Sequence, residues 1–209
     1  MLASKPIFFV IAGPNGAGKS TLSKSILKPY GITAFDWDAE FNKLWSKYSY
    51  DLSIQDGIRN NVNNNFIELL NNALYNNIHF SFETNFNSEL VMTHVNKAKE
   101  KGFTTCLIYF VMDNMQNCIH RVNNRNLLGG HYVSPDTIQE RFSQGLINLE
   151  KFKHQFDSIF IIDSSLEWDI RGLTISKEKV TLIIEHIHKN TLSKYTPEII
   201  INMNQGLSM

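Results

Sequence analysis

Cysteine is scarce in this sequence, where only Cys106 and Cys118 occur among 209 residues. Two cysteines form no disulfide framework, and they lack the spacing of a zinc site. Cys106 lies in an apolar run, so we expect a small buried side chain there rather than a reactive thiol. The scarcity excludes the disulfide-stapled class of small proteins and gives no support to a zinc-dependent one.

Net charge and long apolar runs are lacking as well. The 20 Lys and Arg residues balance the 20 Asp and Glu residues, and the sequence pI is about 7.1. This balance gives no overall attraction to nucleic acid or to an anionic membrane, so a nucleic acid partner is not expected. No run approaches the roughly 18 apolar residues of a membrane span, and residues 1–6 hold no apolar stretch of a secretory signal. We therefore expect no membrane contact and a cytoplasmic location.

What the chain does contain is an alternation of short apolar runs with amphipathic stretches. The apolar runs predict strands at residues 7–12, 32–35, 78–82, 104–112, 158–162 and 170–175. Apolar residues at helical spacing predict helices near residues 18–28, 41–48, 58–73, 88–101, 115–127, 134–152 and 180–187. Such alternation indicates an α/β fold with a mostly parallel sheet and helices on both faces. Residues 1–192 are expected to form one domain, and 193–209 a loosely attached tail.

The most specific feature is a glycine-rich loop between the first predicted strand and the first predicted helix. It matches the phosphate-binding pattern G-x-x-x-x-G-K-[ST] and reads Gly13-Pro14-Asn15-Gly16-Ala17-Gly18-Lys19-Ser20, followed by Thr21. The glycines let consecutive backbone N–H groups approach phosphate oxygens at a helix N-terminus. Lys19 would place its charge on the β- and γ-phosphates, Ser20 would ligate Mg²⁺, and Thr21 would lie near the α-phosphate. The motif predicts ATP and Mg²⁺ as cofactors.

This loop, together with four segments that follow it, resembles the zeta toxin family of P-loop kinases. The four segments are Phe35-Asp36-Trp37-Asp38, Ser81-Phe82-Glu83-Thr84-Asn85, the arginine-bearing stretch from Arg121 to Arg141, and Asp163-Ser164-Ser165. The resemblance spans residues 7–165 and is strongest to the short, stand-alone members. It implies a P-loop kinase fold with an arginine-bearing lid near residues 115–145.

The resemblance also implies an activity and partners. Members of the family phosphorylate a hydroxyl of a small acceptor, UDP-N-acetylglucosamine in the best-known cases, and are held in check by an antitoxin. Three positions depart from the family pattern: Asp36 replaces the usual Asn, Asn85 replaces a common Thr, and Ser134 replaces a Pro that is shifted here to Pro135. These departures leave the phosphoryl-transfer residues intact and leave the acceptor open.

Carboxylates near the ends of two predicted strands are the candidates for work on the acceptor. Asp38 is the candidate general base, because a hydroxyl that attacks the γ-phosphate needs a proton acceptor. Asp36 is the rival for that role, and a helix N-cap is the alternative role for Asp38. Glu83 is predicted to bind acceptor hydroxyls, with a solvated loop carboxylate as the alternative, and Thr84 to orient the acceptor or bind Mg²⁺-bound water. Strand ends are where α/β sheets place their sites.

Three arginines are the candidates for stabilising the transferred phosphoryl group. Arg121 and Arg125 are four residues apart and share one face of a predicted helix, and Arg141 lies on the next one. Positioned guanidinium groups stabilise the charge on the equatorial oxygens in phosphoryl transfer. Surface arginines are the alternative interpretation. The Gly129-Gly130 pair between the two helices is a predicted hinge of the lid.

Some roles stay open at this level. His131 is expected to support the lid conformation rather than the chemistry. Asp113 or Asp163, each after an apolar strand, is predicted to support Mg²⁺ through water, and the sequence does not choose between them. A nucleotide-dependent switch and a polynucleotide-end kinase are the alternative functions. The paired carboxylates Asp38 and Glu83 favour an acceptor over a switch, and the neutral charge balance speaks against a polynucleotide groove.

Overall fold

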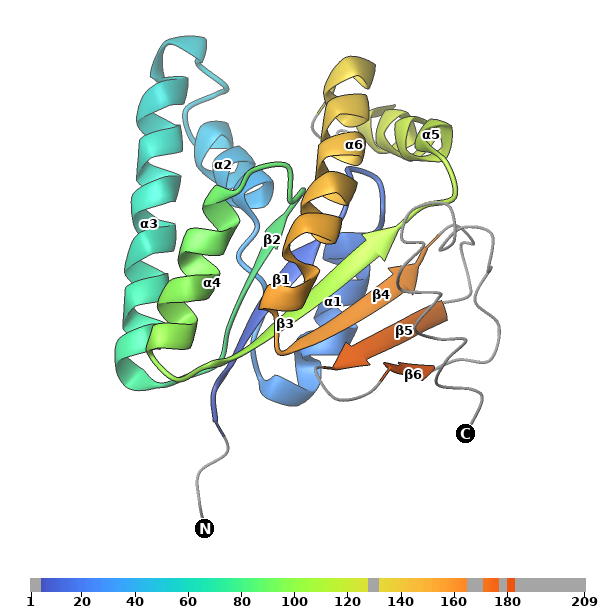
Figure 1. Cartoon of the computed structure of the whole chain (residues 1–209). Coiled ribbons are helices and arrows are strands. Elements are labelled where there is room, and N and C mark those ends of the chain that lie inside the picture. The colour runs from blue at the N-terminus through green and yellow to red at the C-terminus, as the bar shows by residue number, and fades with distance from the viewer. Residues whose placement is uncertain (1–4, 128–131, 165–170, 177–179, 183–209) are drawn as a thin grey trace.

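A six-stranded sheet forms the centre of this computed structural model, which describes residues 5–127, 132–164, 171–176 and 180–182 (Figure 1). The strands are β1 (Ile7–Ala12), β2 (Phe80–Thr84), β3 (Thr104–Val111), β4 (Ser158–Asp163), β5 (Arg171–Ser176) and β6 (Val180–Leu182). Their order across the sheet is β2-β1-β3-β4-β5-β6. The first four are parallel to one another, whereas the β4–β5 and β5–β6 pairs are antiparallel. The predicted mostly parallel sheet is confirmed.

Helices cover both faces of this sheet. They are α1 (Lys19–Leu27), α2 (Trp37–Ser46), α3 (Gln55–Asn76), α4 (Leu90–Glu100), α5 (Met115–Leu127) and α6 (Pro135–Phe152), with short 3-10 turns at Lys28–Tyr30, Leu52–Ile54 and Lys153–Gln155. In Figure 1, α4 and α6 lie in front of the sheet and α1 lies behind it. Two separate apolar clusters, one on each face, fill the space between the sheet and the helices. The predicted three-layer arrangement is therefore confirmed.

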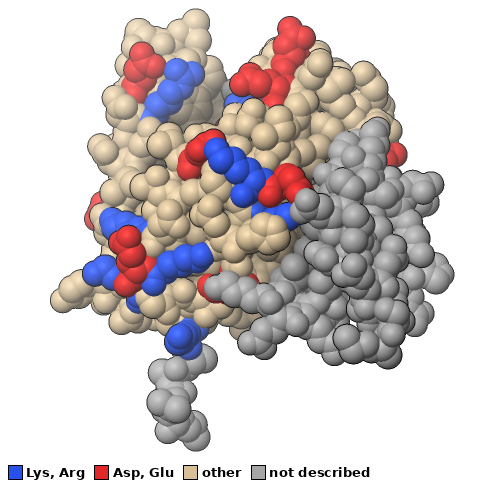
Figure 2. Space-filling view, in the orientation of Figure 1, with Lys and Arg blue, Asp and Glu red and all other residues tan. Residues whose placement is uncertain are grey.

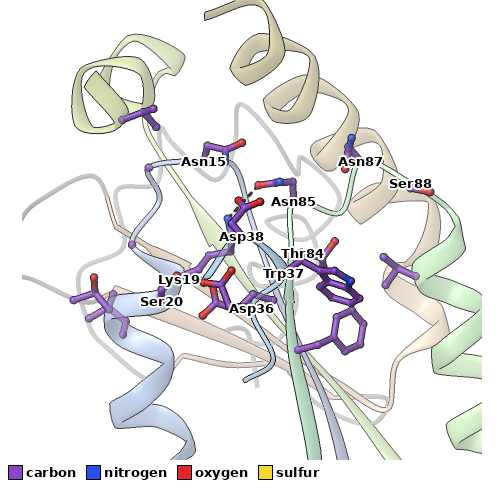
Figure 3. Close-up of a pocket in the computed structure, with 18 of the residues that line it drawn as sticks. Asn15, Lys19, Ser20, Asp36, Trp37, Asp38, Thr84, Asn85, Asn87 and Ser88 are labelled. Atoms are coloured by element: carbon purple, nitrogen blue, oxygen red, sulfur yellow. Dashed lines mark hydrogen bonds between the residues drawn. The ribbon is translucent and has the colours of Figure 1, made fainter. Parts of the chain in front are cut away.

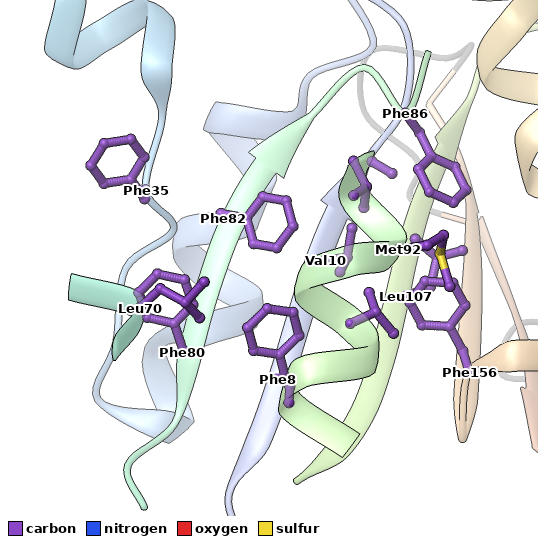
Figure 4. Packing of buried hydrophobic residues seen from close by; sticks show 14 of the residues in the cluster. Phe8, Val10, Phe35, Leu70, Phe80, Phe82, Phe86, Met92, Leu107 and Phe156 are labelled. Carbon is purple, nitrogen blue, oxygen red and sulfur yellow. The ribbon is translucent and has the colours of Figure 1, made fainter. Parts of the chain in front are cut away.

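The central strands carry continuous apolar runs because both of their faces are covered. Along β1, Phe8 and Val10 belong to the cluster that includes α3 and α4 residues, whereas Phe9 and Ile11 belong to the cluster toward α1 and α5. The parallel register sets Phe8 beside Phe80 of the neighbouring strand β2, and Figure 4 shows this packing. Burial on both faces is the physical reason that a parallel strand shows no polar alternation.

The asparagine-rich segment is helical, as its apolar stripe predicts. In α3, the residues Ile58, Val62, Phe66 and Leu70 recur every four positions and are all buried, while the asparagines between them are exposed. Asparagine has poor intrinsic helix propensity. Burying each large apolar side chain contributes roughly 1.5–3 kcal/mol, which outweighs a propensity deficit of a few tenths per residue. The helix ends at Asn77, whose left-handed φ of 52° makes the turn.

Residues 32–35 do not form the predicted strand. Only Phe35 pairs with the sheet, through an isolated parallel bridge to Phe82 of β2. The reason is local, because Asp36 already caps α2 and the extended chain ends after one paired residue. The segment therefore lies beside β2 at the sheet edge, and not beside the strand that leads into the glycine-rich loop.

The C-terminal part of the described chain also differs from the prediction. Val180–Leu182 is the strand β6, paired with β5, rather than the start of a helix, so β5 is not an edge strand. The β-branched Val180 and Thr181 favour a strand, and so short an apolar run is compatible with either period. Residues 183–187 of the predicted helix and the predicted tail 193–209 lie outside the described residues. The domain limits of 1–192 stay a prediction.

Charges of both signs are mixed on the face shown in Figure 2, where blue and red side chains lie next to one another. Exposed ion pairs such as Lys151–Glu89, with Nζ and Oε1 2.6 Å apart, connect α6 to the loop before α4. Within the described ranges, no helix combines the length and apolar character needed to cross a membrane.

Candidate active site

The glycine-rich loop joins the carboxyl end of β1 to α1 and passes very close to the neighbouring elements. Gly13 and Gly16 have positive φ values of 138° and 82°. A Cβ atom on Gly13 would lie 2.5 Å from the carbonyl oxygen of Phe110, and one on Gly16 would lie 2.7 Å from that of Cys118. Both positions therefore require glycine, for conformation and for space. This close packing fixes the loop against β3 and α5.

Lys19, the first residue of α1, points back into the loop. Its Nζ donates to the carbonyl oxygens of Gly13 (2.7 Å) and Pro14 (3.0 Å) and to Oδ1 of Asn85 (3.2 Å; Figure 3). Burial lowers the pKa of the Lys19 ammonium to about 8, and the nearby carboxylates, led by Glu83, oppose this shift. A buried cation held mainly by neutral carbonyls has much to gain from an anionic ligand.

Glu83 is the carboxylate that lies against the start of α1. The Ser20 hydroxyl donates to Oε2 of Glu83 at 2.7 Å, and the Ser23 hydroxyl donates to Oε1 at 3.1 Å. Oδ2 of Asp36 is a second acceptor near the Ser20 hydroxyl, at 3.1 Å. Burial, the larger cause, and the charge of Asp36 raise the pKa of Glu83, while the serine hydrogen bonds and Lys19 lower it. Glu83 thus lies within strand β2, which extends past the predicted end at residue 82, and the alternative of a solvated loop carboxylate is wrong because the side chain is buried.

The residues around Ser20 fit a magnesium ion in chemical type. Hydroxyl and carboxylate oxygens of Ser20, Glu83 and Asp36 are the hard ligands that Mg²⁺ prefers, and in nucleotide sites phosphates and waters complete its shell. No group of three or more His, Cys, Asp or Glu side chains that could hold a metal ion occurs among the residues that the structure describes.

The two acids predicted to support Mg²⁺ do not line the pocket around Ser20. Asp113 accepts hydrogen bonds from the N–H of Asn114 and from Nδ2 of Asn117, both at 2.8 Å, and so organises the start of α5. Asp163 is buried at the end of β4. The carboxylates nearest to Ser20 are instead Glu83 and Asp36, which sequence reasoning had given to the acceptor. The sequence could have indicated this role, because Glu83 lies near the end of β2 and Asp36 directly before α2.

Asp36 and Asp38 have different roles at the start of α2. Asp36 is the N-cap, since its Oδ1 accepts the N–H of Ala39 at 3.1 Å. Asp38 lies in the first turn of the helix, is exposed and lines the pocket. Figure 3 shows Asp38 between the glycine-rich loop and Trp37. The capping role that was the alternative for Asp38 belongs to Asp36, and this leaves Asp38 facing the pocket.

The three predicted arginines divide into two groups. Arg121 and Arg125 line the pocket from α5, and Nη1 of Arg121 lies 3.4 Å from the sulfur of Met112. Arg141 is not a lining residue. Its Nη1 donates to Oδ1 of the buried Asn15 at 3.1 Å, so it supports the glycine-rich loop from α6. The Gly129-Gly130 pair and His131 lie outside the described residues.

The loop after β2 is held by its own side chains and by α6. The hydroxyl of Thr84 accepts the N–H of Phe86 at 3.0 Å, and Phe86 has a left-handed φ of 57°. Nδ2 of the buried Asn148 donates to the carbonyl oxygen of Phe86 at 2.8 Å. Gly145, one turn earlier on α6, lies so close that a Cβ there would be 2.7 Å from the carbonyl oxygen of Asn85. Thr84 therefore shapes the turn that presents Asn85 to Lys19.

These parts open on one pocket of about 1060 Å³. Among the residues of the glycine-rich motif, those that line it are Asn15, Gly16, Gly18, Lys19, Ser20 and Thr21, whereas Gly13, Pro14 and Ala17 are buried behind them. Sequence reasoning gave no role at the pocket to Trp37, Asn63, Asn85 and His94, which also line it. Little in the sequence indicated that these residues share a pocket, because they come from four different segments of the chain.

A buried parallel strand, a glycine-rich loop and a helix that opens with Lys19 and Ser20 define a P-loop kinase fold. The sequence pattern of the zeta toxin family matches residues 2–171. The chain therefore belongs to the zeta toxin family, as its motifs had suggested.

Three similar proteins share part of this sequence or its fold. An uncharacterized protein of Haemophilus influenzae is 25% identical over 148 residues, which are 68% of this chain and 95% of that protein. A structure from the PezAT toxin-antitoxin system of Streptococcus pneumoniae has a TM-score of 0.61 at 15% identity, covering 99% of this chain and 89% of that one. The AvrRxo1-ORF1:-ORF2 structure with ATP has a TM-score of 0.66 at 12% identity, covering 93% and 64%. At these identities the two solved structures show a common fold.

Proposed function

We propose that this protein is an ATP- and Mg²⁺-dependent kinase that transfers the γ-phosphate to a hydroxyl group of a small acceptor. One observation carries the proposal: the glycine-rich loop, the Asp38 carboxylate and the arginines of α5 line a single pocket. Its volume of about 1060 Å³ is at the upper end for a small-molecule site, commonly ~300–1,000 Å³, which leaves room beside a nucleotide. Family membership and the ATP bound in a protein of the same fold support the choice of donor.

On the donor side, backbone N–H groups of the loop and the Lys19 ammonium bind the phosphates. Mg²⁺, when bound, would neutralise charge on the phosphate oxygens, with Ser20 and the carboxylates of Glu83 and Asp36 holding it directly or through water. Arg121 and Arg125 are placed to stabilise charge on the transferred group, because they line the pocket from α5. Arg141 would act through Asn15, by holding the loop.

Asp38 is the proposed general base. It is exposed to the pocket, whereas Asp36 caps α2 and approaches Ser20. As the acceptor oxygen bonds to the γ-phosphorus, the bond from phosphorus to the β–γ bridging oxygen breaks, and ADP leaves with that electron pair. The hydroxyl proton passes to Asp38, and Thr84 and Asn85 shape the neighbouring wall.

Two finer proposals come from the family. The family resemblance points to a UDP-N-acetylsugar as one acceptor class to test. An antitoxin is the proposed protein partner, supported by the toxin-antitoxin system from which a protein of the same fold comes. A bound antitoxin is expected to lower phosphate transfer, which a titration of activity against the copurified partner would measure.

The direct experiment follows the γ-phosphate itself. Full-length protein, γ-labelled ATP and Mg²⁺ are incubated with nucleosides, nucleotide sugars and polynucleotide ends, and products are identified by mass spectrometry. We expect label on a small hydroxyl compound, and its loss in Asp38→Asn with ATP binding retained. ATP hydrolysis that no acceptor changes would indicate a nucleotide-dependent switch, and label on polynucleotide ends would indicate an end kinase. Either result would contradict the proposal.

A further inference from the structure

The pocket continues beyond Asp38 into a region built from α2, α3, β2 and α4. We name this region the ring compartment and define it by the lining residues Trp37, Asn63, Phe66, Phe82, Val91 and His94. In Figure 3, Trp37 lies on the far side of Asp38 from Ser20, and Asn87 and Ser88 lie farther along the same side. The compartment is therefore adjacent to the proposed base and separate from the phosphate loop.

Aromatic rings form the wall of this compartment. The ring centroids of Trp37 and Phe66 are 4.2 Å apart, those of Phe66 and His94 5.1 Å, and those of Trp37 and Phe82 5.7 Å. Nε1 of Trp37 donates to Oδ1 of Asn63 at 3.1 Å, which fixes the plane of the indole ring. Phe66 and Phe82 are fully buried behind the partly exposed Trp37. Fixed aromatic surfaces of this kind bind flat rings by stacking.

The charges of the pocket are divided between its two ends. The lining cations Lys19, Arg121 and Arg125 belong to the phosphate loop and to α5. Among the described residues that line the ring compartment none is Lys or Arg, and Asp36 and Asp38 lie at its entrance. A phosphate group placed beyond Asp38 in this compartment would be desolvated with no Lys or Arg among the described lining residues to pair with it.

His94 does not supply a cation in their place. Burial, and then the charge of Lys97, lower the pKa of its imidazole, which disfavours the charged form. The polar groups on this side of the pocket are amides and a hydroxyl instead, those of the lining residues Asn63, Asn87 and Ser88. Amide groups match the donor and acceptor edges of a heteroaromatic ring.

We propose that the ring compartment binds an uncharged molecule with a flat heteroaromatic ring and hydroxyl groups, the chemistry of a nucleoside, and that this is the acceptor. The ring stacks on Trp37, and a hydroxyl of the attached sugar faces Asp38. The acceptor role rests on the proposed kinase function, whereas ring binding does not. The acceptor class therefore departs from the diphosphate-bearing sugar nucleotide that the family resemblance implies.

Calorimetry on the full chain, saturated with Mg²⁺ and ADP to fill the donor side, tests the binding. The probes are uridine, adenosine, N-acetylglucosamine and UDP-N-acetylglucosamine. We expect a nucleoside to bind at least about tenfold more tightly than N-acetylglucosamine, the scale of one base–aromatic stack. UDP-N-acetylglucosamine should bind more weakly than uridine, because its diphosphate finds no Lys or Arg among the described residues that line the ring compartment. Tighter binding of UDP-N-acetylglucosamine than of uridine would overturn the proposal.

Substitutions at Trp37 supply the matched controls. Trp37→Leu should weaken nucleoside binding by about tenfold or more, whereas Trp37→Phe should retain most of it. Tyr75→Leu removes an exposed ring elsewhere on α3 and should change nothing. Thermal melts confirm that each variant is folded. A folded Trp37→Leu protein with unchanged nucleoside affinity would also overturn the proposal.

Absence of kinase activity and absence of ring binding would give different experimental results. If a nucleoside binds through Trp37 but no hydroxyl compound is ever phosphorylated, the kinase function fails and the ring compartment stands. If a sugar nucleotide is phosphorylated while nucleosides neither bind nor react, the kinase function stands and the ring compartment is refuted. Phosphorylation of a nucleoside, with its KM raised in Trp37→Leu and the KM for ATP unchanged, supports both.

Discussion

The two ends of the pocket differ in the groups that form them, which are backbone groups at one end and side chains at the other. At the phosphate end, backbone groups of one short loop make the site, and glycines hold that backbone against β3 and α5. At the ring compartment, side chains from α2, α3 and α4 make the site, with Trp37, Asn63 and His94 far apart in the sequence. A backbone site is encoded by consecutive residues, whereas a side-chain site depends on how helices pack. Substitutions at one end should therefore leave binding at the other end largely intact.

Removing the cation of the phosphate end should have the largest effect. We expect Lys19→Ala to lower turnover by about 10³-fold or more, the scale of lost electrostatic stabilisation in phosphoryl transfer. The Tm should not fall, because burial disfavours the charged ammonium that is removed. Phosphate-transfer assays and circular-dichroism melts measure the two quantities, with the exposed Lys24→Ala as a control on the same helix. Wild-type turnover in folded Lys19→Ala protein would remove the loop from the mechanism.

Asp38 lies where the two ends meet, and its substitution should separate chemistry from binding. Asp38→Asn keeps the shape but loses the proton acceptor, so we expect turnover to fall by about 10²–10⁴-fold with the ATP Kd unchanged. Asp36→Asn is the comparison variant, because asparagine caps a helix as well as aspartate does. The substitution removes a proposed Mg²⁺ ligand, so a loss that added Mg²⁺ restores would come from the metal and not from a lost base. Transfer that survives in Asp38→Asn and disappears in Asp36→Asn would move the base to Asp36.

Substitutions of the three arginines test whether the predicted lid takes part in phosphate transfer. Arg121→Ala or Arg125→Ala should lower kcat by about 10²-fold, below the arginine-finger scale, with little change in ATP affinity. Arg141→Ala should act less on kcat and more on ATP binding, because its guanidinium holds Asn15 of the loop. Steady-state kinetics and calorimetry separate these effects. If all three variants keep kcat close to wild type, the predicted lid has no catalytic role.

The lowered pKa of Lys19 makes ATP binding depend on pH at the phosphate end only. The free ammonium loses its proton near pH 8, and bound phosphates favour the charged form. ATP affinity should therefore be constant below about pH 8 and fall by up to about tenfold per unit above it. Stability should run the other way, rising with pH between about 8 and 10.5, because there the folded state binds fewer protons than the unfolded state. Calorimetry and urea melts on Lys19→Met should show neither trend.

The smallest effect concerns the packing that connects the two ends. In Gly145→Ala the new Cβ would lie 2.7 Å from the carbonyl oxygen of Asn85 and 2.8 Å from the hydroxyl of Tyr109, so α6 must shift. We expect a loss of about 1–3 kcal/mol in the free energy of unfolding. Gly57→Ala in α3 meets nothing within 4 Å and should instead add about 0.5–1 kcal/mol. Urea denaturation of the pair measures both, and equal stability of the two variants would refute the close contact.

Much of the fold could be predicted because its signals are local. The strands β1 and β3 and the helices α5 and α6 begin and end within a residue or two of the predicted limits, and Ser134 caps α6. The predictions were wrong where a segment was too short to show whether its apolar residues follow the helical or the strand period. Residues 32–35 are cut short by the Asp36 cap of α2, whereas residues 180–182 form a strand because they pair with β5.

By itself, the sequence determined the phosphate end, since consecutive residues from Gly13 to Ser20 specify a backbone path that only glycine permits at two points. The tertiary structure alone decided the long-range pairs: Ser20 with Glu83, which are 63 residues apart, and Asn15 with Arg141, which are 126 residues apart. It also decided that Asp36 caps α2 while Asp38 faces the pocket, and that rings from three helices and from strand β2 form one wall. The physical reason is that a turn is governed by the φ angles and space of its own residues, whereas a hydrogen bond between distant side chains exists only once the sheet and its covering helices have packed.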